Sequence, residues 1–166
     1  MPKSPHLLLA AANVRKLHSN LVDVLEQVAL DAIDAEIQAN IGQLYSLGRS
    51  HFLFAIRQGN RDWRQKISRL YYAAYNVSRA VRLCVNGEYS TDASDHKKIE
   101  VLPDDFPNKN TYANRLAVLR EDRNLCDYDH VASRSDLVWS EDDSAEIVEK
   151  FLRDAKKYLR GRRVEI

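Results

Sequence analysis

The sequence of 166 residues has few of the residues that stabilise small extracellular or fibrous proteins: two cysteines, five glycines and four prolines. So few cysteines exclude a disulfide framework, and a chain of this length can bury a core without one. Cys84 and Cys126 have no neighbouring Cys or His, so we expect reduced core thiols in a cytoplasmic protein. The apolar run at residues 7–12 is too short to span a membrane and predicts the start of a helix.

The sequence also lacks the common motifs of phosphate and metal chemistry. It contains no glycine-rich phosphate loop, no GxSxG, no HExxH and no CxxC, which argues against P-loop hydrolases, common serine hydrolases and zinc enzymes. The five histidines never pair at metal-ligand spacing, so we expect no metal and no cofactor. Lys and Arg number 25 against 24 Asp and Glu, so an anionic partner must be held by a local cluster.

Apolar residues recur at intervals of three and four along most of the chain, and no segment alternates as a strand does. The pattern predicts a single all-α domain, residues 1–166, with about five long helices and one short helix. Two helices over about 4–30, with a break near Asn20, and 32–58 would form an N-terminal hairpin in residues 1–59. A core in residues 60–160 would hold long helices over about 61–85, 110–129 and 141–160, and a short helix over about 94–101.

The helix over 61–85 has the most basic face in the chain. This face is either a solvated cationic surface or a wall that binds RNA phosphates, together with Arg120 of the following long helix. We interpret His96, in the irregular connection between those two helices, as an incidental surface histidine. The basic residues of the face are Arg64, Lys66, Arg69, Arg79 and Arg82, of which Arg79 and Arg82 are the candidate phosphate ligands.

A polar strip lies near the end of the helix over 110–129. If the helix continues, Arg123, Asp127 and His130 share one face. Asn124 and Tyr128 form a second pair on the adjoining strip. An imidazole can move a proton from the 2′-hydroxyl of RNA or to the leaving 5′-oxygen, and a guanidinium can stabilise the charge on phosphorus. Because one helix supplies one copy of each group, a two-fold homodimer would complete the site.

These residues resemble the HEPN domains (higher eukaryotes and prokaryotes nucleotide-binding), whose signature is Arg, commonly followed by Asn, with a His four to six residues further on. Arg123-Asn124 and His130 fit with six intervening residues, and Tyr71-Tyr72-Ala73-Ala74 is similar to a motif in the family's earlier long helix. The resemblance implies an antiparallel helical bundle and a metal-independent endoribonuclease that dimerises through the motif. It also implies a toxin with a nucleotidyltransferase-type antitoxin partner, or a component of anti-phage defence.

Carried onto this chain, the resemblance makes Arg123 and His130 catalytic, with Asn124, Asp127 and Tyr128 in support. Tyr128 occupies the place that His takes in the short form of the motif. Members without that His look like modules that bind a nucleotide or a nucleotidyltransferase partner, and this is the alternative function. In a third interpretation the bundle is only structural, and Arg123 and Asp127 form an ordinary ion pair worth roughly 0.3–0.5 kcal/mol.

Overall fold

The computed structural model describes residues 13–90 and 92–166, and this part of the chain is all-helical, as predicted. The described residues form no strand, and one isolated bridge joins Asn13 to Glu88. None of their helices is both long enough and apolar enough to cross a bilayer. The α-helices are α2 (Val14–Leu21), α3 (Gln27–Ala55), α4 (Trp63–Asn86), α5 (Lys109–Tyr128) and α6 (Glu141–Arg160), and the 3₁₀ helices are η1 (Asn60–Asp62), η2 (Ala93–Lys98) and η3 (Arg134–Asp136).

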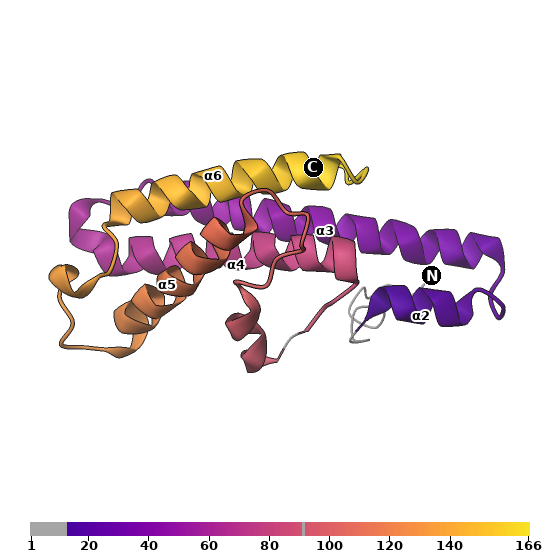
Figure 1. Cartoon of the computed structure of the whole chain (residues 1–166), viewed down its shortest axis with the longest axis horizontal. Coiled ribbons are helices and arrows are strands. Elements are labelled where there is room, and N and C mark those ends of the chain that lie inside the picture. The colour runs from indigo at the N-terminus through magenta and orange to yellow at the C-terminus, as the bar shows by residue number, and fades with distance from the viewer. Residues whose placement is uncertain (1–12, 91) are drawn as a thin grey trace.

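Helix α4 is the centre of the bundle. It lies antiparallel to α3 over most of its length, with α6 along one side of this pair and α5 crossing α4 at an angle (Figure 1). Both sides of α4 are buried, including Ala73, Ala74 and Ala80, whose small side chains let neighbouring helices approach. Opposite them, a Cβ on Gly48 of α3 would lie 2.6 Å from Val77 Cγ2, so the approach requires glycine there.

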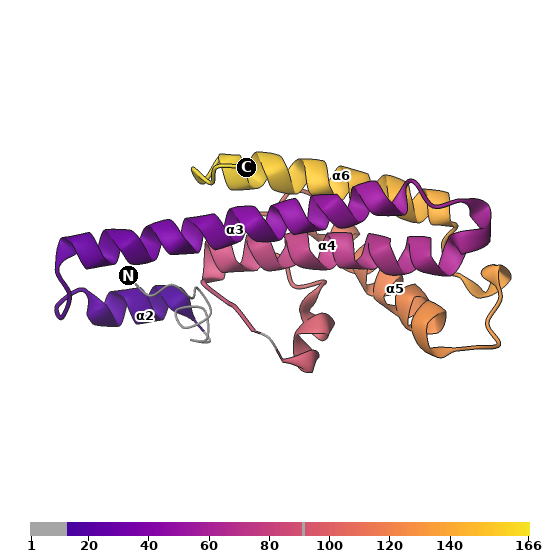
Figure 2. The ribbon, with the colours of Figure 1, turned by 180° about the vertical axis from the view of Figure 1, so that it is seen from behind.

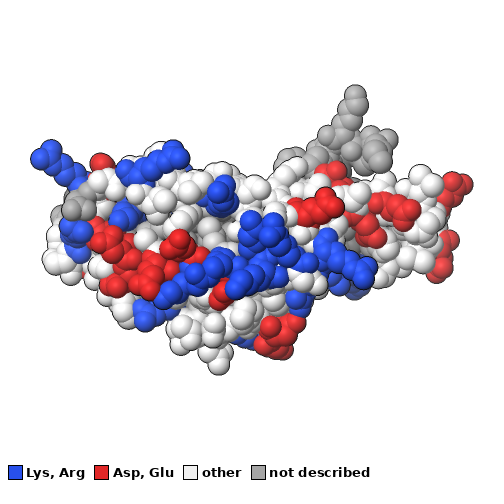
Figure 3. All heavy atoms as spheres, turned by 90° about the horizontal axis from the view of Figure 1, so that it is seen from above, with Lys and Arg blue, Asp and Glu red and all other residues white. Residues whose placement is uncertain are grey.

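Local signals in the sequence explain where α4 and α6 end and begin. Gly87 follows α4 with φ +67°, a left-handed conformation that glycine adopts without strain. The Ser140 hydroxyl accepts a hydrogen bond from Asp143 N at 3.1 Å and caps α6. Acidic residues fill the first turn of α6 and basic residues its last turn, which complements the helix dipole and contributes to the separated red and blue areas in Figure 3.

The boundary between the first two predicted helices is wrong. Residues 22–26 form the turn, and α3 begins at Gln27, so Val28 and Leu30 belong to α3. The break predicted near Asn20 agrees with the end of α2 at Leu21, but the apolar residues keep helical spacing across the turn, which is why the first predicted helix continued to residue 30. The part of the predicted first helix in residues 4–12 lies outside the described residues. Helix α2 packs beside the N-terminal part of α3 as a hairpin (Figure 2), and Val14 of α2 joins the same buried cluster as Ile41 and Tyr45 of α3 and the core residues of α4.

Candidate functional site

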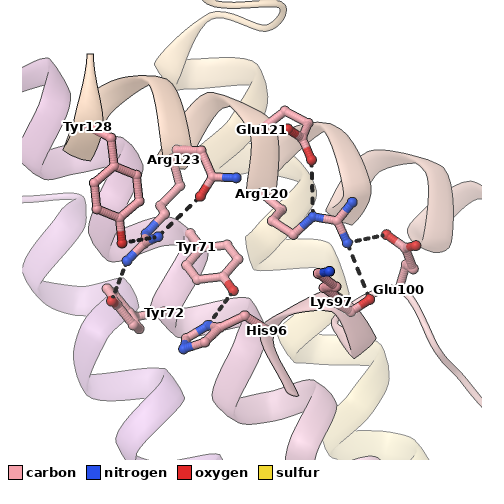
Figure 4. A pocket seen from close by; sticks show the side chains of 10 residues that line it. Tyr71, Tyr72, His96, Lys97, Glu100, Arg120, Glu121, Arg123 and Tyr128 are labelled. Atoms are coloured by element: carbon pink, nitrogen blue, oxygen red, sulfur yellow. Dashed lines mark hydrogen bonds and ion pairs between the residues drawn. The ribbon is translucent and has the colours of Figure 1, made fainter. Parts of the chain in front are cut away.

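An open cleft of about 720 Å³ lies between α4, η2 and α5 (Figure 4). Four of the candidate site residues line it, all from α5: Arg120, Arg123, Asn124 and Tyr128. The opposite walls come from α4 and from the connection that contains η2. Their lining residues are Tyr71, Tyr72, His96, Lys97 and Glu100, and Glu121 completes the α5 wall.

The guanidinium of Arg123 is fixed by hydrogen bonds on several sides. Nη2 donates to the Tyr72 hydroxyl at 2.8 Å, and Nη1 donates to the Tyr128 hydroxyl at 3.1 Å. Nη1 also donates to Asn124 Oδ1 at 3.2 Å, and Nε lies 2.7 Å from Asp127 Oδ2. Burial alone would lower the pKa of Arg123, but the two tyrosine hydroxyls and the charge of Asp127 outweigh it and raise that pKa. Arg123 is therefore a permanent, well-oriented cation at the edge of the cleft.

Aromatic rings surround this cation. The guanidinium carbon lies 5.4 Å from the ring centroids of Tyr71 and Tyr72 and 5.1 Å from that of Tyr128. Tyr71 is fully buried, whereas Tyr128 is 73% exposed. Exposed tyrosine rings beside arginine are the surfaces on which single-stranded nucleic acid bases stack.

The structure brings His96 into the cleft, which the sequence interpretation missed. Its Nδ1 lies 2.7 Å from the Tyr71 hydroxyl, and its ring stacks on that of Tyr75 with centroids 4.4 Å apart at 16°. Burial and the positive charge of Arg123 lower the pKa of His96 below 6.5, although Asp95 opposes this. His96 is therefore a neutral imidazole near pH 7.

The neighbouring residue, Asp95, explains why His96 points into the cleft. Asp95 is 1% exposed and accepts two hydrogen bonds from Arg82, at 3.0 and 2.9 Å, and one from the Tyr75 hydroxyl at 3.0 Å. Burial raises the pKa of this carboxyl, but the hydrogen bonds and charge of Arg82 and the bond from Tyr75 together hold it below its usual value. A buried ion pair thus clamps η2 onto α4 directly beside His96.

The expectation that Arg79 and Arg82 line a phosphate-binding wall is wrong. Arg82 is 2% exposed and bonded to Asp95, and Arg79 donates to the Ser90 carbonyl at 2.9 Å with its guanidinium over the Tyr89 ring. Both hold the connection after α4 and lie outside the cleft lining. Arg120 does line the cleft, where it donates to Glu100 at 3.0 Å.

The basic face of α4 as a whole is neither a solvated surface nor a single wall, because its cations bind other elements. Lys66 pairs with Asp142 of α6 at 2.9 Å, and Arg69 lies over the Phe54 ring of α3. Arg64 donates to main-chain carbonyls at and beyond the end of α5: those of Cys126 (2.8 Å), Asp129 (2.7 Å) and Ala132 (2.6 Å).

The expectation that His130 shares a helix face with Arg123 is also wrong. Helix α5 ends at Tyr128, and Asp129 has extended backbone angles with its Oδ1 accepting from Val131 N at 3.0 Å. This turn and the carbonyl contacts of Arg64 lead the chain away from the helix axis. His130 is exposed and does not line the cleft.

The fold and the cleft define an all-helical protein with a tyrosine-lined, arginine-bearing cleft. Within residues 13–90 and 92–166, no group of His, Cys, Asp and Glu is arranged to hold a metal ion. Comparisons of the chain with protein-family models, with curated proteins and with solved structures give no significant match.

Proposed function

We propose that the protein is a metal-independent endoribonuclease of the HEPN type that binds single-stranded RNA in the cleft beside Arg123. The observation that carries the proposal is the presence of a fixed guanidinium, a neutral imidazole and an exposed tyrosine ring in one open cleft. A guanidinium stabilises the charge that develops on phosphorus, an imidazole transfers the proton, and a tyrosine ring stacks a base.

The charge of the cleft supports an anionic ligand. Its lining contains the three basic residues Lys97, Arg120 and Arg123 against the two carboxylates Glu100 and Glu121, a formal excess of one positive charge. Each of those carboxylates lies beside Arg120, with Oε2 of Glu100 at 3.0 Å and Oε1 of Glu121 at 3.1 Å. The two carboxylates are thus paired with Arg120, and Asp127 pairs with Arg123 at 2.7 Å, so Lys97 and the partly neutralised Arg123 are the lining cations that can attract a phosphate.

The active form is proposed to be a homodimer that brings two copies of the end of α5 together. Tyr128 lies at this end and Val131 just beyond it, and they are 73% and 77% exposed, so both side chains are accessible to a second copy. The wider role, as a toxin with a nucleotidyltransferase-type antitoxin or a component of anti-phage defence, is what the HEPN resemblance implies.

A second candidate function is a non-catalytic module that binds a nucleotide or a nucleotidyltransferase partner. It is favoured by two features of the site: His130 lies outside the cleft lining, and both Nη atoms of Arg123 already donate to protein groups while its Nε lies beside the Asp127 carboxylate. A cation held in this way can attract a phosphate without taking part in its cleavage.

Cleavage of a labelled single-stranded RNA in excess EDTA separates the two functions. Wild type should cut RNA and leave DNA of the same sequence intact, because DNA lacks the 2′-hydroxyl nucleophile. Arg123→Ala should lower the rate by roughly 10²–10³-fold, whereas Arg153→Ala, an exposed arginine of α6, should not. RNA binding without cleavage by the folded wild type would contradict the ribonuclease proposal and favour the binding module.

A further inference from the structure

We propose that His96 is the general base of the cleft and that His130 is not. The proposal rests on the ribonuclease function and names the group that takes the proton from the 2′-hydroxyl of the bound RNA. The position of the imidazole, the contacts that hold it and its protonation state support this assignment.

The position of His96 leaves one ring nitrogen for a ligand. Nδ1 lies 2.7 Å from the Tyr71 hydroxyl, so this nitrogen is occupied, and Nε2 is the nitrogen that can meet a ligand in the cleft (Figure 4). When Nδ1 donates its hydrogen to Tyr71, Nε2 carries the lone pair that a base requires. Arg123 faces the same space from α5, with its guanidinium 5.4 Å from the Tyr71 ring.

The orientation of His96 is fixed by contacts that do not depend on a ligand. Asp95, the preceding residue, is anchored by Arg82 and by Tyr75. The ring of Tyr75 stacks on the imidazole, and the carbonyl of Ile99, beyond η2, accepts from the Ser78 hydroxyl at 3.0 Å. A base held this firmly loses little freedom when the substrate binds, which is a condition for efficient proton transfer.

The charged and titratable groups around His96 keep it unprotonated near neutral pH. Arg123 of α5 and Arg79 of α4 add to the effect of burial and lower the pKa of His96. Asp95, which lies on η2 itself, acts in the opposite direction. The phenol groups of Tyr71 and Tyr75, which face the ring from α4, have pKa values raised by burial and stay neutral. The imidazole is therefore ready to accept a proton at pH 7.

The proposed step is an internal transesterification of RNA. His96 Nε2 takes the proton of the 2′-hydroxyl as the 2′-oxygen forms a bond to the neighbouring phosphorus. The bond from phosphorus to the 5′-oxygen of the next nucleotide breaks, and this oxygen takes a proton from water. The products are a 2′,3′-cyclic phosphate and a 5′-hydroxyl, and the imidazolium returns its proton to solvent. Arg123 stabilises the charge on the non-bridging oxygens in the transition state.

The test compares matched asparagine variants of the two histidines in RNA cleavage. His96→Asn keeps an N–H that can donate to Tyr71 but has no basic nitrogen, and should lower kcat by roughly 10²–10⁴-fold with little change in KM. His130→Asn should retain cleavage within about threefold, since an exposed residue outside the cleft contributes little. Thermal unfolding of both variants reports on the fold, and His96→Gln replaces His96→Asn if the latter does not fold.

The pH profile gives a readout that loss of structure would not mimic. The kcat/KM of wild type should fall as the pH drops, with a midpoint below 6.5, because the base must be unprotonated and its pKa is lowered. The residual kcat/KM of His96→Asn should not show this decrease at low pH. A midpoint at or above 6.5 would overturn the assignment.

The outcomes distinguish failure of the base assignment from failure of the proposed function. If His130→Asn abolishes cleavage and His96→Asn does not, the base is wrong and the ribonuclease stands. If folded wild type does not cleave, both proposals fall. In that case, imidazole NMR signals with RNA carrying 2′-fluoro groups would show whether the cleft binds RNA at His96 without cleaving it.

Discussion

Two connections flank α5, and each carries one histidine, yet they place these histidines differently. The connection before α5 is clamped to α4 through a buried side chain, Asp95, and presents His96 to the cleft. The connection after α5 is held mainly through its main chain, by Arg64 on three carbonyls beyond or at the helix end, and leaves His130 exposed. A side-chain anchor fixes the direction of its neighbour, whereas a main-chain anchor fixes only the path of the chain.

The largest expected effect is loss of the anchor in the first connection. Asp95→Ala would leave the buried guanidinium of Arg82 with only Glu88 at 3.8 Å, and should lower the free energy of unfolding by about 3–5 kcal/mol. Urea denaturation measures this loss. Asp104→Ala, which removes an exposed carboxylate, is the matched control and should change stability by less than about 0.5 kcal/mol. Equal stability of the two variants would show that the clamp contributes nothing.

A smaller effect is expected from the anchor of the second connection. Arg64→Met removes the donor to the carbonyls of Cys126, Asp129 and Ala132, and should cost about 1–3 kcal/mol. Amide hydrogen exchange should accelerate at residues 129–133 and stay unchanged at residues 94–99. Faster exchange in both segments would mean that the two connections are not held independently.

The two connections should also respond to pH in opposite directions. Asp95 has a lowered pKa, so its stabilisation is present above pH 3.8 and is lost as the pH falls below that value. Burial raises the pKa of Asp122, whose Oδ1 accepts from Val138 N at 3.0 Å, so its contribution to stability declines as the pH rises above 3.8.

Asparagine variants test this difference by denaturation at pH 3, 5 and 7. Relative to wild type, Asp95→Asn should become more destabilising as the pH rises from 3 to 5, because the charge that it lacks is then formed in wild type. Asp122→Asn should become less destabilising over the same series. A common trend in both variants would contradict the opposite roles of the two carboxyls.

The smallest effect is expected at the helix between the connections. Asp127→Asn weakens the ion pair with Arg123 and should cost only about 0.3–0.5 kcal/mol, because Tyr72 and Tyr128 still hold the guanidinium. A double-mutant cycle of Asp127→Asn with Tyr72→Phe measures the coupling. A loss above about 1.5 kcal/mol for the single variant would mean that Asp127 dominates the position of Arg123.

The sequence predicts those parts of the fold that depend on neighbouring residues. Periodicity predicts the helical class, Gly87 marks the end of α4, and Ser140 marks the start of α6. Arg123 and its partners Asn124, Asp127 and Tyr128 come together because they are close on one helix. Whether these residues act in catalysis stays a prediction.

The errors fall where contacts join distant residues. His130 leaves the helix face under the influence of Arg64, which lies 65 positions before the Asp129 carbonyl that it binds. Arg82 looked like a surface cation because its partner Asp95 lies in an irregular segment. The sequence contains a clue to this contact: Tyr71, Tyr75 and Arg82 lie close to one strip of α4. This strip is too polar to pack only against an apolar core, and the irregular segment that follows α4 contains an aspartate.

The tyrosines around Arg123 change what a ligand would meet. Tyr72 and Tyr128 accept hydrogen bonds from the guanidinium through their oxygens, so the hydrogen of each hydroxyl remains free to be donated. Because hydrogen bonds in a chain polarise one another, the cation makes these hydroxyls stronger donors. Arg123 would then stabilise a bound phosphate indirectly, through hydrogen bonds from two neutral hydroxyl groups. Each hydroxyl can rotate about its C–O bond, so its hydrogen bond can follow phosphate oxygens that move during a reaction.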